Sequence, residues 1–149
     1  MTIKSTAKTI ACIPRIPVIS IIVICLATPA FAAKPPGTQS GAATYFTYAS
    51  CLREGTSGIT ASGKLLVDSC LWCALPASTA KTWNIKYGAS IRVTNLITGR
   101  TVTVKYMDRG PGRKSQRAGT VIDLTLRAYK ALGGSLKRGH IHITWKKVT

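Results

Sequence analysis

The stretch SIRVTNLITGRTVTVKY, residues Ser90–Tyr106, predicts two β-strands joined by a tight turn. Apolar and polar side chains alternate over residues 90–96 and again over 100–106, which is the pattern of half-buried strands. Ile97-Thr98-Gly99 lies between them and supplies the glycine that short hairpin loops favour. The segment therefore predicts a β-hairpin in the middle of the chain.

Shorter segments on both sides of the hairpin have the same strand character. The expected strands are Ala42–Tyr48, Val121–Leu124 and His140–Trp145. Residues 125–132 predict a two-turn helix, capped by Asp123 or Thr125 and ended by two glycines. Several short strands with one short helix, and no βαβ repeat, predict a small β-barrel.

Three segments between these elements carry turn or breaker residues. Residues 54–63 and 108–119 are rich in glycine, so both are expected to be loops. Pro76 argues against a continuous helix through residues 71–85. This last segment therefore gives no clear prediction.

The first 32 residues have the three parts of an export signal. Lys4, Lys8 and Arg15 precede the apolar run at 18–27, and Ala30-Phe31-Ala32 presents small residues where a signal peptidase cuts. An uncleaved membrane anchor is the alternative, although the run is well short of the ~20 residues that span a bilayer. We therefore expect a signal peptide at 1–32 cleaved near Ala32, a linker at 33–40 and one domain at 41–149, exported to the periplasm or the extracellular medium.

The chain of 149 residues carries 21 lysines and arginines against four acidic residues, a formal net charge of +17. Four carboxylates are too few for a two-metal nuclease or an EF-hand, and we expect neither a metal nor a cofactor. The excess of cations indicates an anionic partner. For an exported monomer we expect peptidoglycan or another anionic wall polymer rather than nucleic acid, with membrane-surface contact as an alternative.

Three cysteines, Cys51, Cys70 and Cys73, follow the predicted leader. In an oxidising compartment one disulfide and one free thiol is the simplest outcome. We favour a disulfide from Cys51 to Cys73, with Cys70 as the alternative partner. Its role would be structural, because no βαβ pattern supports a redox function for Cys70 and Cys73.

Several blocks of sequence follow one another in a specific order. They are Gly41–Phe46 (GAATYF), Thr60–Gly63 (TASG), Tyr87–Leu96 (YGASIRVTNL), Asp108–Pro111 (DRGP) and Val121–Thr125 (VIDLT). In this order and spacing they resemble the double-psi β-barrel domain of the rare lipoprotein A family, and expansins share that barrel more distantly. The resemblance implies a mainly β fold, a six-stranded double-psi β-barrel with one or two short helices.

That family includes periplasmic lytic transglycosylases, which cut peptidoglycan glycan strands by an intramolecular route. The resemblance implies that Asp108, in the Asp-Arg-Gly-Pro motif, is the catalytic acid and base. One carboxyl suffices: it protonates the glycosidic oxygen and then takes a proton from the sugar's 6-hydroxyl, which attacks the anomeric carbon. Hydrolysis by water normally uses two carboxyls, so a chain with four acidic residues fits the lytic route better.

One residue of the family pattern is missing. Counting back from Asp108 to the position of the family's histidine reaches Thr82, although Cys73-Ala74 resembles a variant subgroup. An expansin-like protein that binds wall polysaccharide without cutting it is therefore the alternative function.

The candidate substrate-binding residues are Tyr45, Thr60, Ser62, Arg109, Arg113 and Asp123. Tyr45 would stack on a sugar ring, and the two arginines belong to a basic loop that would attract an anionic polymer. Structural alternatives stand beside these roles. Tyr45 would also suit the core, Asp108 would also suit the turn that follows it, and Asp123 would also suit a helix cap.

Overall fold

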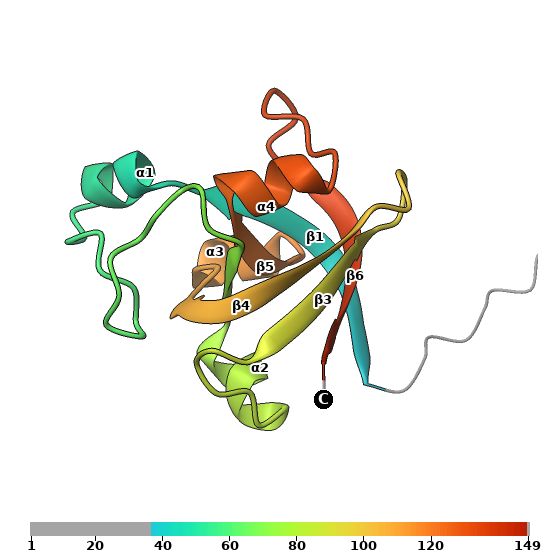
Figure 1. Cartoon of the computed structure of the whole chain (residues 1–149), viewed down its shortest axis with the longest axis horizontal. Coiled ribbons are helices and arrows are strands. Elements are labelled where there is room, and N and C mark those ends of the chain that lie inside the picture. Colours follow the sequence, from blue (N-terminus) through green and yellow to red (C-terminus); the bar gives the residue numbers. More distant parts are fainter. Residues whose placement is uncertain (1–36, 149) are drawn as a thin grey trace, which may run out of the picture. The chain divides into compact units, whose positions relative to one another are not determined.

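The computed structural model describes residues 37–148, so the predicted signal peptide at 1–32 and residues 33–36 of the predicted linker lie outside the described residues. This part of the chain forms six strands and four short helices (Figure 1). The strands are β1 (Thr38–Phe46), β2 (Trp72–Leu75), β3 (Ser90–Asn95), β4 (Thr101–Arg109), β5 (Thr120–Thr125) and β6 (Ile141–Lys147). The helices are α1 (Tyr48–Arg53), α2 (Ala77–Thr82), α3 (Arg113–Arg117) and α4 (Leu126–Ala131).

The six strands close into a barrel in the order β1-β5-β2-β4-β3-β6 (Figure 1). β1 pairs with β5, and β2 with β4, in parallel, whereas the remaining neighbours are antiparallel. The predicted hairpin is confirmed, since Ser90 pairs with Lys105 and Thr94 with Thr101 across β3 and β4. The prediction of a mainly β, six-stranded barrel is confirmed as well.

Alternate side chains of the strands fill the barrel interior. Ile91 and Val93 of β3 are fully buried, and so is Ile143 of β6. Two large aromatic side chains are buried with them, Trp145 from β6 and Tyr129 from α4. Burying a large apolar side chain contributes on the order of 2–3 kcal/mol, so these two residues are major contributors to the core.

Several elements differ from the sequence prediction where long-range pairing supports additional structure. Residues 38–40, expected in the linker, begin β1 because they pair with residues 144–146 of β6. The expected loop at 108–119 is partly regular, since β4 runs through Arg109 and α3 follows it. Residues 71–85 form β2 and α2, and the described chain has four short helices rather than one or two.

Helices α4 and α2 lie at opposite ends of the barrel in Figure 1. On α2's side of the barrel, Trp83 packs on Trp145 with the ring centroids 5.1 Å apart. No helix within residues 37–148 is long and apolar enough to cross a membrane.

Candidate functional site

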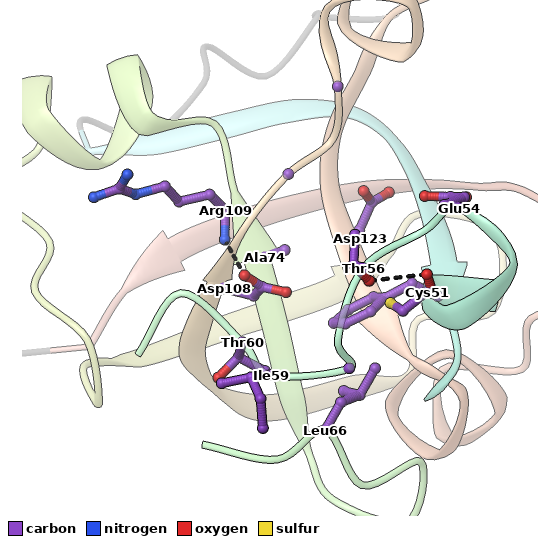
Figure 2. Close-up of a pocket in the computed structure, with 14 residues that line it drawn as sticks. Cys51, Glu54, Thr56, Ile59, Thr60, Leu66, Ala74, Asp108, Arg109 and Asp123 are labelled. Carbon is purple, nitrogen blue, oxygen red and sulfur yellow. Dashed lines mark hydrogen bonds between the residues drawn. The ribbon is translucent and has the colours of Figure 1, made fainter. Parts of the chain in front are cut away.

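A cavity of about 250 Å³ gathers carboxyl groups at one side of the barrel (Figure 2). Three of the four acidic residues of the chain line it, namely Glu54, Asp108 and Asp123. The three carboxyls thus gather at one place in a chain that carries 21 lysines and arginines. Clustered carboxyls in a cavity mark a candidate functional site.

Strand pairing places two of these carboxyls on either side of one small residue. Ala74 of β2 pairs with Asp108 of β4 on one side and with Asp123 of β5 on the other. Neighbouring strands lie about 4.8 Å apart, so the two aspartate backbones are separated by roughly 10 Å. The methyl side chain of Ala74 leaves the space between them open, and all three residues line the cavity.

Asp108 accepts two backbone hydrogen bonds at the end of β4. Its Oδ1 accepts from the N–H groups of Ala61 and Arg109, both at 2.8 Å. The N–H of Ser62 also donates to the carbonyl of Met107, at 3.1 Å, so the 54–63 segment is attached to β4 at two points. Asp108 therefore holds this segment against β4 and lines the cavity as well, whereas the structural alternative placed its hydrogen bonds in the turn that follows it.

Asp123 lies within β5 and is half-buried. Its Oδ1 accepts a hydrogen bond from the hydroxyl of Thr44, its register partner on β1. Burial raises the pKa of Asp123 to about 6, and the charges of Glu54 and Asp108 act in the same direction. Gly110 leaves room for this carboxyl, because a Cβ at that position would lie 3.1 Å from Asp123 Oδ2. Asp123 thus carries a proton below about pH 6.

Replacing Asp123 by asparagine is expected to stabilise the protein above pH 6. The pKa of Asp123 is raised from 3.8 to about 6 in the folded protein, so the folded state holds this proton more tightly than the unfolded chain. Stability therefore falls as the pH rises from about 4 to about 6. Asparagine still accepts from Thr44 but carries no charge, so the free energy of unfolding at pH 7 should increase by about 2–3 kcal/mol.

Urea unfolding of both proteins at pH 4 and pH 7 measures this effect. The difference between them should nearly vanish at pH 4, where the aspartate is also neutral. An equal difference at both pH values would contradict the assignment of a raised pKa to Asp123.

Comparison with known proteins identifies the fold. No family model matches the chain, and neither does any curated protein sequence. Streptomyces papain inhibitor is 29% identical with a TM-score of 0.54, and the match covers 75% of this chain and 94% of that one. Expansin of Clavibacter michiganensis matches in its apo form (23% identity, TM-score 0.54) and as a mutant in complex with cellohexaose (21%, 0.53). Both matches again cover 75% of this chain, which spans 50% of the expansin chains.

This chain is a double-psi β-barrel. The resemblance to the rare lipoprotein A family is confirmed at the level of the fold. In this double-psi β-barrel the two parallel pairs, β1 with β5 and β2 with β4, bring Asp123 and Asp108 to the same cavity.

The double-psi β-barrel brings together four of the predicted site residues, namely Thr60, Asp108, Arg109 and Asp123. Thr60 is buried, and its hydroxyl lies 2.8 Å from that of Ser62 and donates to the carbonyl of Lys64. It therefore shapes the turn beside the cavity. The side chain of Arg109 points away from Asp123 (Figure 2).

Three predicted residues do not line the cavity, namely Tyr45, Ser62 and Arg113. Tyr45 packs on Tyr129 with ring centroids 4.9 Å apart, in agreement with its core alternative. Arg113 begins the exposed helix α3. The helix-cap alternative for Asp123 is wrong, because Thr125 is the N-cap of α4 and Asp123 lies within β5.

The sequence analysis missed most of the other lining residues, among them Glu54, Ala74 and Gly110. The scarcity of acidic residues was a signal for Glu54. Ala74 gave no signal, because its importance comes from pairing with two strands distant in sequence. Thr82, at the expected histidine position, lies on α2 and does not line the cavity.

The three cysteines of the described chain are free thiols in this structure. Cys73 is fully buried in β2, whereas Cys51 is half-buried and lines the cavity. Burial raises the pKa of both thiols. The disulfide between Cys51 and Cys73 is not formed here and stays a prediction.

Proposed function

We propose that this double-psi β-barrel binds a polysaccharide strand of the cell wall, with Asp108 and Asp123 contacting the sugar in the cavity. The observation that carries the proposal is the pairing of both aspartates with Ala74, which leaves two carboxyls flanking an open space. The expansin mutant crystallised with cellohexaose supports a sugar ligand for a barrel of this fold. Export through the predicted signal peptide would bring the protein to that polymer.

Lytic cleavage of peptidoglycan is the finer proposal for the same cavity. The proton donor of that reaction must be neutral at the start, and Asp123 has a pKa of about 6. Asp108 Oδ1 already accepts two amide hydrogen bonds. The family resemblance implies acid and base roles for Asp108; we propose instead that Asp123 moves the proton and Asp108 contacts the sugar.

The proposed step balances with one carboxyl. Asp123 gives its proton to the glycosidic oxygen as the bond from that oxygen to the anomeric carbon breaks. The 6-hydroxyl oxygen of the same sugar attacks that carbon, and its proton passes to the Asp123 carboxylate. The products are a shortened strand and an anhydro-ended fragment, with Asp123 protonated again.

Incubation with purified peptidoglycan glycan strands tests both the glycan binding and the lytic cleavage. We expect the protein to bind the strands and release anhydro-ended fragments, identified by mass spectrometry. Asp123→Asn should abolish the fragments while retaining binding, because asparagine cannot donate this proton. Asp68→Asn is the matched control, since Asp68 does not line the cavity.

Two results would distinguish glycan binding from lytic cleavage. Binding without fragments would overturn lytic cleavage and leave the expansin-like function standing. Absence of binding to both peptidoglycan strands and cellohexaose would overturn the proposed function as a whole.

We also propose a second candidate function, inhibition of papain-like proteases. Streptomyces papain inhibitor is matched over 94% of its chain at 29% identity. Beside the cavity, residues 52–67 expose four apolar side chains of the kind that contact proteins, namely Leu52, Ile59, Leu65 and Val67. Titration of papain amidase activity with the protein tests this function, and full papain activity at a large molar excess would overturn it.

A further inference from the structure

A second cavity, of about 400 Å³, lies beside the carboxyl-lined one. Helix α2 and the turn at 84–87 form one wall, and Tyr106 and Arg109 of β4 form the other. Arg109 lines both cavities, so they are adjacent along the end of β4. A strand bound in the first cavity would extend past Arg109 into the second.

Tyr87 presents an exposed aromatic ring in this second cavity. Its ring stacks on Tyr106, with centroids 4.9 Å apart and an interplanar angle of 27°. Tyr106 is 3% exposed and Tyr87 is 38% exposed, so the inner ring supports the outer one. Backbone hydrogen bonds hold the turn on β4, from Gly88 to the Tyr106 carbonyl at 2.8 Å and from Tyr106 to the Ala89 carbonyl at 3.0 Å. A fixed, exposed aromatic ring is a surface on which the C–H face of a sugar packs.

Arg109 is oriented by the same tyrosine. Its Nε donates to the Tyr87 hydroxyl at 2.9 Å. Its terminal nitrogens have no hydrogen-bond acceptor among residues 37–148. A guanidinium fixed in this way presents paired donors that match the two oxygens of a carboxylate.

Two lysines add positive charge to the same cavity. Lys81 on α2 and Lys86 in the turn line it, and both are exposed. The acidic residues that line either cavity, Glu54, Asp108 and Asp123, all belong to the first cavity. Within one continuous surface, the first cavity is therefore acidic and the second is basic.

We infer that the second cavity is a subsite for a carboxylate-bearing sugar, whose ring packs on Tyr87 and whose carboxylate meets Arg109, Lys81 and Lys86. The inference rests on the proposed glycan binding and adds a substrate class to it. A sugar without charge occupies the first cavity, because Glu54 and Asp108 repel a carboxylate there. The protein thus prefers an acidic glycan over a neutral one of equal length.

Isothermal titration with matched oligosaccharides tests this preference. The probes are cellohexaose, a hexamer of galacturonic acid with its carboxylates on C6, and soluble peptidoglycan strands with carboxylates on a lactyl ether. We expect at least one acidic probe to bind about tenfold more tightly than cellohexaose at low salt, in line with one or two charge-assisted contacts. The tighter of the two acidic probes identifies which carboxylate position the subsite accepts.

Paired variants distinguish this subsite from general attraction by a basic protein. Lys81→Gln with Lys86→Gln should remove most of the preference. Lys130→Gln with Lys137→Gln removes the same charge on α4 and in the segment after it, away from this cavity, and should leave the preference intact. Tyr87→Phe keeps the ring but removes the hydroxyl that orients Arg109. It should lower the affinity for the acidic probe more than that for cellohexaose, because only the carboxylate depends on the oriented guanidinium.

Each outcome of this experiment bears on one claim. Equal affinity for all three probes, or an equal loss in both lysine pairs, would overturn the acidic subsite and leave glycan binding standing. Failure of every probe to bind would overturn the proposed function together with the subsite.

Discussion

Replacing Ala74 by leucine is expected to lower the affinity for a glycan roughly 1000-fold, about 4 kcal/mol. Ala74 is paired with both aspartates, and its methyl group faces the cavity of about 250 Å³ that they line. A leucine at this position would occupy the space between the two carboxyls. The sugar would then lose its contacts with both carboxyls at once. Titration with peptidoglycan strands and cellohexaose measures the loss.

Two further variants keep this result interpretable. Ala74→Gly enlarges the space and should retain binding. Ala131→Leu adds the same side chain on the exposed surface of α4 and should change neither binding nor stability by a measurable amount. Normal binding by a folded Ala74→Leu protein would show that the sugar does not occupy this cavity.

Replacing Trp145 by alanine is expected to lower the free energy of unfolding by about 4 kcal/mol. Trp145 is 1% exposed on β6 and packs on Trp83 with the ring centroids 5.1 Å apart. Truncation removes this buried surface and leaves a cavity that the closed barrel cannot collapse to fill. Domains of this size are stable by about 5–15 kcal/mol, so the loss is a large part of the total.

Urea unfolding followed by circular dichroism measures this second effect. Trp145→Phe is the matched control and should lose about 1–2 kcal/mol, because it keeps an aromatic ring in the core. A loss below about 1 kcal/mol for the alanine variant would contradict the placement of Trp145 in the core.

The fold was predictable where the sequence pattern is local. Ser90–Tyr106 alternates cleanly and forms the β3–β4 hairpin as expected. β2 was not predictable in this way, because Trp72–Leu75 is a short apolar run whose partners lie 30 or more residues later in β4 and β5. Its parallel pairing depends on tertiary structure that local alternation does not encode.

The site was predictable only in part for the same reason. Asp108 lies in the Asp108–Pro111 motif and Asp123 in the Val121–Thr125 block, and the barrel brings both to one cavity. The role of Tyr87 could not be predicted from the residues next to it in sequence. Its ring is held by contacts with Tyr106 and Arg109, which lie on β4. The sequence shows only that basic residues outnumber acidic ones. The fold places the acidic residues in one cavity and Lys81 and Lys86 in the other.

The pairing of the first strand with the last has a mechanical consequence. Thr38 at the start of β1 lies opposite Lys146 near the end of β6, and the two strands run antiparallel. A force applied through Thr38 and Lys146 would break the hydrogen bonds between these strands one after another, as in unzipping, rather than loading them together. A protein tethered through its ends would therefore open at this seam under weak tension, while Asp108 and Asp123 lie on the other strands, β4 and β5.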